Sequence, residues 1–276
     1  MTSPPLVLGL DRIIRHAYLR GQTLHGDLSV PLEQYESYLI PIIEKRFGLS
    51  EEQVLPSTIL KTLYLEDLYL SIACAEASEI AWRKFAAIYG EYIRKIALYV
   101  CTTGDQANEL SSSVMADLYM PDRAGRSRIA GYDGRISLAS WLRVVIKNRA
   151  INMRERKCNS DVPLESVIEL ASDYSTCEIE ISLRAKKYGA MIRESFSIAC
   201  RNLTNRERFI LVMRFDEGLK ANKIAEMLGM NQIKLSREIR KIEKKLHDSV
   251  IANLSGAYGL SDAVVQECLV GIVENP

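Results

Sequence analysis

Residues 217–246 read EGLKANKIAEMLGMNQIKLSREIRKIEKKL, and they carry the clearest structural signal in the chain. Apolar side chains recur there at helical spacing, which predicts a short helix over 220–228 and a longer helix over 231–246. Gly229 falls between them, where a tight turn favours the left-handed backbone that glycine adopts without a steric penalty. The buried side of the longer helix is expected to contain residues at steps of four, three and four, namely Leu235, Ile239, Ile242 and Leu246.

The other face of this longer predicted helix is rich in cations and amides. In a helix-turn-helix, the N-terminal part of the second helix enters the major groove of DNA and reaches base edges, where Arg or Lys suits guanine and Asn or Gln suits adenine. The base-reading candidates are Asn231, Gln232, Lys234, Ser236 and Arg237. The residues expected to meet phosphates are Arg240, Lys241 and Lys244. The alternative is an ordinary helical hairpin with a solvated basic face.

The rest of the chain also has helical periodicity. It holds 15 glycines and 8 prolines in 276 residues and no convincing alternation of apolar and polar residues, so we predict an all-α fold. The predicted organisation is two small helical domains joined by a linker, the C-terminal one a helix-turn-helix, with an N-terminal helical extension. Its parts are an extension over 1–79, a first domain over 80–157, an acidic linker with a helix over 158–199, a helix-turn-helix domain over 200–254, and a tail over 255–276.

The net charge of +1 conceals two basic blocks. Lys and Arg exceed Asp and Glu by seven over residues 81–157 and by six over 200–246. Acidic residues are in excess by five over 1–80, by three over 158–199 and by four over 247–276. This pattern is typical of a chain with two surfaces that face polyanions. Chance clustering of charge on solvated helices is the alternative.

The first basic block contains a predicted helix over 138–157 with a second cationic stripe. The residues expected on that stripe are Arg143, Lys147, Ala150 and Arg154. The other side is expected to hold Leu138, Trp141, Val145, Asn148 and Asn152. In the glycine-containing loop before the helix, Tyr132 is a candidate for stacking on an unpaired base, and Arg135 for holding the DNA backbone. The alternatives are a solvated basic face and an ordinary polar turn.

The two blocks together resemble the sigma-70 family of bacterial RNA polymerase sigma factors, most closely its extracytoplasmic-function type. The resemblance rests on LASWLRVVIKNRAINMRERK at 138–157 and LTNRERFILVMRFDEGLKANKIAEMLGM at 203–230. It implies that two preceding helices, FAAIYGEYIRKIALYV at 85–100 and ANELSSSVMADLY at 107–119, dock on the polymerase clamp. It further implies that 138–157 recognises the minus-ten promoter element and that 203–230 belongs to the domain that reads the minus-thirty-five element. The implied minus-ten residues are Tyr132, Arg135, Arg143, Lys147, Asn148, Asn152 and Arg154. The implied polymerase contacts are Glu109, Leu110, Met115, Asp117 and Leu118.

The resemblance also implies a function. Such a protein binds core RNA polymerase and directs promoter recognition, DNA melting and transcription initiation, and an anti-sigma factor is a further candidate partner. The alternative is a stand-alone helix-turn-helix regulator that binds DNA without recruiting polymerase. Regulators of that kind usually dimerise, and we find no sustained heptad repeat for a dimer.

Enzymes, metalloproteins and membrane proteins are disfavoured, because the sequence lacks their characteristic motifs. It has no phosphate-binding glycine loop, no HExxH motif and no clustered Cys and His, so we expect neither an enzyme nor a metal or cofactor. No apolar run approaches a membrane helix, and no basic segment precedes the short apolar stretch near the N-terminus, so a cytoplasmic location without membrane association is expected. The acidic residues 1–80 either mask a basic surface or form a stabilising helical cap.

Overall fold

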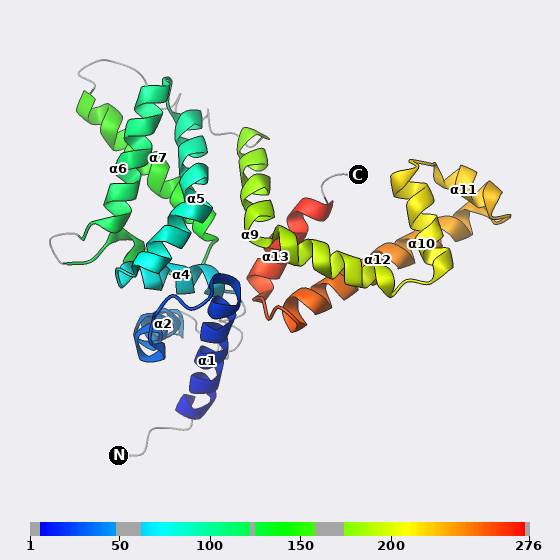
Figure 1. Ribbon diagram of the computed structural model, residues 1–276, viewed down its shortest axis with the longest axis horizontal. Coiled ribbons are helices and arrows are strands. Elements are labelled where there is room, and N and C mark those ends of the chain that lie inside the picture. Colours follow the sequence, from blue (N-terminus) through cyan, green and yellow to red (C-terminus); the bar gives the residue numbers. More distant parts are fainter. Residues whose placement is uncertain (1–5, 48–61, 122–124, 158–173, 274–276) are drawn as a thin grey trace. The chain divides into compact units, whose positions relative to one another are not determined.

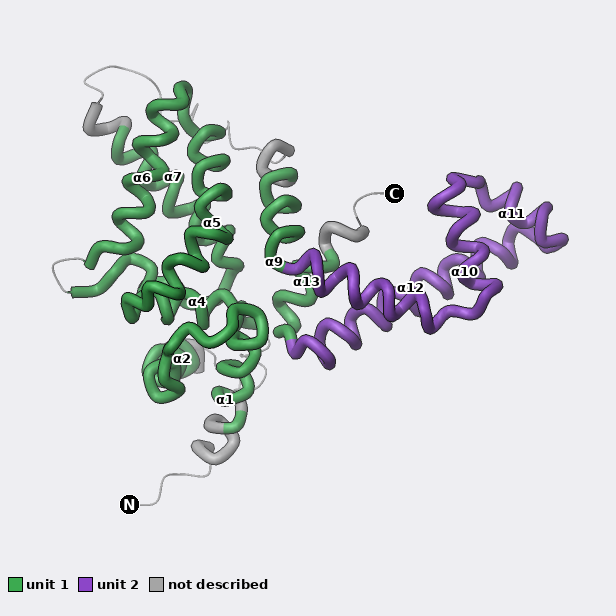
Figure 2. Tube along the Cα trace, viewed as in Figure 1, with its two compact units in different colours: residues 1–187, 260–276 green, residues 188–259 purple. Residues whose placement is uncertain are grey.

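The computed structural model is all-α, as predicted, and divides into two compact units (Figures 1 and 2). It describes residues 6–47, 62–121, 125–157 and 174–273. Within these ranges there is no strand beyond an isolated bridge between Pro121 and Ser127. Unit 1 comprises residues 1–187 and 260–276, and unit 2 comprises residues 188–259.

Unit 1 is built from the helices of the first 157 residues together with two later segments. Its elements are α1 (Leu6–His25), α2 (Leu32–Phe47), α4 (Leu65–Ala75), α5 (Glu79–Val100), α6 (Gly104–Tyr119), η1 (Arg128–Gly131), α7 (Leu138–Lys157), the first part of α9 (Tyr174–Arg201), and α13 (Asp262–Val273). Pro41 lies inside α2, which is continuous in the structure although proline usually kinks or breaks a helix.

The core of unit 1 centres on α4. Every residue from Leu65 to Cys74 is buried, because this helix is apolar on nearly all sides. α1 approaches it closely at Gly21, where an added Cβ would lie 2.3 Å from the Cβ of Tyr69. The helices of residues 1–79 therefore share one core with the predicted first domain and do not form a separate extension. This placement favours the stabilising cap over a detachable mask.

Unit 2 contains the predicted pair of helices. Its elements are the rest of α9, α10 (Asn205–Leu211), the π-helical turn η2 (Val212–Asp216), α11 (Ala221–Met227) and α12 (Gln232–Gly256). Gly229 has a φ of +61°, in the left-handed region, as its place in the turn requires. α12 continues ten residues beyond Leu246, the end predicted for it, because Val250 and Leu254 extend the buried seam.

The C-terminal tail returns to unit 1 and does not form an independent segment. Ser261 precedes α13, and its backbone amide and its hydroxyl both donate to the Glu66 carboxylate, each at 2.6 Å. Both groups are buried, so the start of α13 is fixed to α4 by a desolvated pair of hydrogen bonds. The sequence predicted that a tail begins at residue 255. In the structure, residue 255 still belongs to α12, and the chain returns to unit 1 at Leu260.

Candidate nucleic-acid interface

The N-terminal half of α12 presents a polar face to solvent. The predicted seam of Leu235, Ile239, Ile242 and Leu246 is buried, which confirms the helical phase read from the sequence. The candidate DNA-facing residues consequently lie on the other side. Of these, Ser236 is half-buried, and the exposed ones are Asn231, Gln232, Lys234, Arg237, Arg240, Lys241 and Lys244.

The start of α12 is fixed by local contacts that leave this face open. The Asn231 side chain caps the helix by accepting from the Ile233 amide at 2.7 Å. Ion pairs join α12 to α10, between Glu238 and Arg206 and between Lys245 and Glu207, each at 3.0 Å. Neither α12 partner in these pairs is a predicted DNA-binding residue.

Ile233 stands at the beginning of the same face and is 62% exposed. An apolar side chain at this position either packs into the turn or stands free to meet a thymine methyl group. Its exposure argues against packing in the turn. An apolar side chain at the start of a helix that enters the major groove is suited to contact with thymine.

On α7 the predicted faces are partly wrong. Ala150 was expected on the cationic stripe but is buried, in line with Leu142 and Ile146 at four-residue steps. Asn148 and Asn152 were expected beside Leu138, and both are exposed. Val144, which sequence reasoning passed over, is exposed on the same side. The outward stripe of α7 is therefore an apolar residue followed by two amides.

The cations of α7 are largely engaged within unit 1. Arg143 is half-buried and forms an ion pair with Glu180 of α9. Arg149 donates to the Ser113 hydroxyl at 2.8 Å and lies 3.4 Å from the Asp117 carboxylate. Lys147 is half-buried, and the side chain of Arg154 lies outside what the structure describes. The continuous cationic stripe predicted for this helix is thus interrupted.

Tyr132 does not serve as the predicted stacking platform. It is 3% exposed, its ring packs edge-on against Trp141, and its hydroxyl donates to the Ile136 carbonyl at 2.7 Å. Burial raises the pKa of this phenol well above its usual value. Arg135 of the same loop is exposed and pairs with Asp133. A base is therefore able to reach Arg135 but not the face of Tyr132.

Two of the five polymerase contacts implied by the resemblance are core residues. Leu110 and Leu118 are fully buried, because they share the inward face of α6 with Ala107 and Val114 at helical spacing. They are thereby excluded from direct contact with a partner. The other three lie nearer the surface, with Glu109 exposed and Met115 and Asp117 half-buried.

The structure adds a buried polar cluster that the sequence did not reveal. Asp67 of α4 accepts from the Tyr89 hydroxyl at 2.9 Å, from the Leu138 amide at 2.9 Å and from the Lys187 ammonium at 2.8 Å. Burial alone raises the pKa of Asp67, but the charge and hydrogen bonds of Lys187, together with the Leu138 amide, outweigh it and hold the pKa below its usual value.

The pKa of Glu66, next to Asp67, is shifted in the opposite direction. Burial raises its pKa, and the hydrogen bonds from Ser261 oppose that shift only in part. Burial also raises the pKa of a third carboxyl group, on Glu267 of α13. The cluster therefore joins α4 to α5, α7, α9 and α13. A pair of adjacent acidic residues inside an otherwise apolar helix was the only signal of it in the sequence.

Comparison with known proteins gives no family assignment. No family model matches this chain, and no curated protein matches it. A helix that crosses a bilayer needs about 20 mainly apolar residues, and none of the described helices has that combination of length and apolarity.

Proposed function

We propose that this chain is a sigma factor of the extracytoplasmic-function type, which brings core RNA polymerase to promoters through two DNA-binding surfaces. The observation that carries the proposal is the polar face of α12. Amides and cations are exposed along its N-terminal half, which directly follows the left-handed turn at Gly229. The buried apolar seam runs along the other side of the helix. These are the features that a recognition helix needs in order to enter a major groove.

A second surface on α7 supports the same function. Val144, Asn148 and Asn152 form an outward stripe, and Arg135 is exposed in the loop before the helix. Amides are suited to hydrogen bonds with the edges of unpaired bases, and guanidinium groups to the backbone. Together with α12, this stripe provides one surface for each of two promoter elements.

The near-neutral net charge of +1 bears on how such a protein binds. Affinity for DNA comes largely from phosphate neutralisation. The free chain is therefore expected to bind promoters weakly and to acquire tight binding only together with polymerase. Tight, sequence-specific binding by the free chain, with two copies on one site, is the result expected of a stand-alone regulator.

In vitro transcription with purified core polymerase and a genomic DNA library tests the proposal. We expect the chain to bind core polymerase, and transcripts to start at a discrete set of sites that share two separated sequence elements. Core polymerase alone provides the baseline. A chain that neither binds core polymerase nor changes its start sites is not a sigma factor.

A further inference from the structure

We propose that residues 178–187 of α9 are an autoinhibitory strap that covers part of the single-stranded DNA surface of α7. The inference rests on the proposed function, because Arg143 is one of the minus-ten residues that the family resemblance behind that function implies. Glu180 of the strap forms an ion pair with Arg143, and both side chains retain little more than a quarter of their exposure, at 28% and 27%. In the free protein, a carboxylate thus occupies the place that a phosphate of DNA would take.

The pair both neutralises and blocks the guanidinium group of Arg143. Carboxylates and phosphates use the same donor geometry of arginine, so the two ligands compete for one site. The Nε–H of Arg143 is buried, and no described residue accepts a hydrogen bond from it. A buried donor without an acceptor destabilises the docked arrangement. The strap therefore covers Arg143 but leaves the Nε–H of Arg143 without a hydrogen bond among the residues that the structure describes.

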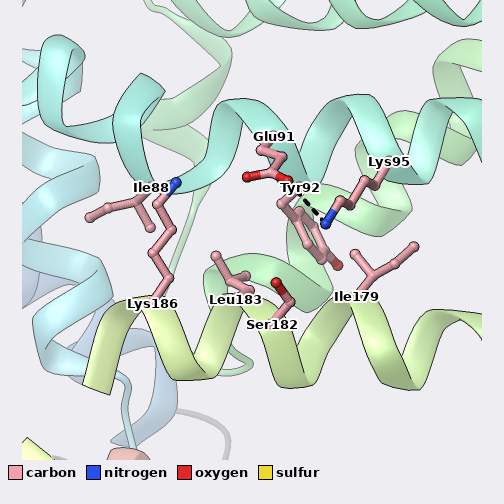
Figure 3. A pocket seen from close by; sticks show the side chains of 8 residues that line it. All are labelled: Ile88, Glu91, Tyr92, Lys95, Ile179, Ser182, Leu183 and Lys186. Atoms are coloured by element: carbon pink, nitrogen blue, oxygen red, sulfur yellow. Dashed lines mark ion pairs between the residues drawn. The ribbon is translucent and has the colours of Figure 1, made fainter. Parts of the chain in front are cut away.

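The strap is packed more loosely than a core helix. Leu183 is its main buried apolar residue, whereas Ile181, Ser182 and Lys186 are exposed. Figure 3 shows Ile179, Ser182 and Leu183 facing α5 across a pocket that Ile88 and Tyr92 also line. Protein interiors leave few such gaps between packed helices. When the strap leaves α7 and α5, little well-packed apolar surface is therefore transferred to water.

One buried ion pair anchors the end of the strap. The Lys187 ammonium lies 2.8 Å from Asp67, and both side chains are almost wholly buried. The second oxygen of Asp67 accepts from the amide of Leu138, the first residue of α7. The strap thus acts on α7 at two places, directly through Glu180 and indirectly through Lys187 and Asp67. This arrangement favours a strap whose N-terminal part, with Glu180, lifts from α7 while Lys187 stays in place.

The test compares two charge-neutralising variants of the full chain. Glu180→Gln removes the masking charge, and Glu178→Gln removes the same charge from an exposed position on the same helix. Binding of a fluorescent single-stranded oligonucleotide is measured over a range of salt concentrations. We expect Glu180→Gln to tighten binding several-fold and to steepen the slope of log K against log salt by about 0.7, the value for one phosphate contact on a single strand. Glu178→Gln is expected to leave that slope unchanged.

Two further measurements separate this inference from the proposed function. In an Arg143→Ala background, Glu180→Gln is expected to change nothing. The rate at which phenylglyoxal modifies Arg143, followed by mass spectrometry, is expected to rise in Glu180→Gln and not in Glu178→Gln. Equal affinities, salt slopes and modification rates for the two variants would overturn the strap. Failure of all the proteins to bind core polymerase would instead overturn the proposed function, and the modification rates would still show whether Glu180 covers Arg143.

Discussion

At the scale of the residue, α12 predicts a division of labour between base reading and phosphate binding. Arg237 lies near the start of the helix and Lys244 two turns further on, and both are exposed. Arg237→Ala is expected to weaken promoter binding by about 1–3 kcal/mol and to relax the choice of base at one position, because a base contact carries sequence information. Lys244→Ala is expected to weaken all promoters alike and to reduce the salt slope by about 1.

Holoenzyme binding to a set of promoters that differ at single positions measures both effects. If the two variants change affinity in the same proportion across the whole set, α12 contains no such division. The comparison is internal, because both substitutions remove one exposed cation from the same helix.

Close packing of α1 on α4 gives a second prediction at this scale. Gly21→Ala places a Cβ 2.3 Å from the Cβ of Tyr69, a contact that only a shift of the helices relieves. We expect it to destabilise unit 1 by about 1–3 kcal/mol, as overpacked cores do. Gly90→Ala in α5 is the control, since nothing lies within 4 Å of its added Cβ. That substitution is expected to be neutral or stabilising. Urea unfolding of both variants provides the measurement.

At the scale of the element, the position of α7 depends on Asp67 of α4. Asp67→Asn removes the carboxylate that lies 2.8 Å from the buried Lys187 ammonium and is expected to reduce stability at pH 7 by about 3–5 kcal/mol. Because the folded-state pKa of Asp67 is lowered, its contribution is present above the unfolded pKa of about 3.9 and is lost as the pH falls through the folded value. The difference in free energy of unfolding between wild type and variant should therefore shrink in acid.

Urea titrations at neutral and acidic pH test this, with Asp67→Asn/Lys187→Met as the companion variant. Removal of both charges avoids a buried ammonium that has lost its Asp67 partner, so the double variant is expected to be more stable than the single one. A single variant as stable as wild type at pH 7 would show that Asp67 does not hold α7.

The elements also show which features are readable from sequence. The α12 seam and the Gly229 turn were predicted correctly because each is a local pattern within about 30 residues. Ala150 was misplaced because α7 mixes small and basic residues on several faces, which weakens its periodicity. The Asp67–Lys187 and Glu66–Ser261 contacts join residues 120 and 195 positions apart, and no local pattern marks such pairs.

At the scale of the whole molecule, the described helices before residue 79, namely α1, α2 and α4, contribute to the core of unit 1. Full burial of a Leu or Ile side chain contributes roughly 1.5–3 kcal/mol, and α4 buries several of them, including Leu65, Leu68 and Ile72. Whole domains are stable by only about 5–15 kcal/mol. The loss of α4 alone is therefore comparable to the entire stability of unit 1.

Deletion of residues 1–75 accordingly distinguishes a core role from a mask. We expect the truncated chain to lose the cooperative unfolding transition of unit 1, seen by circular dichroism on heating, and to lose binding to core polymerase with it. A removable acidic mask gives the opposite result, namely a folded protein with tighter DNA binding and a steeper salt dependence. Glu66→Gln in the full chain completes the comparison. It replaces a buried acidic side chain of the same segment with an amide whose oxygen still accepts from the Ser261 N–H. Its DNA affinity should therefore match wild type if the segment acts only through the core.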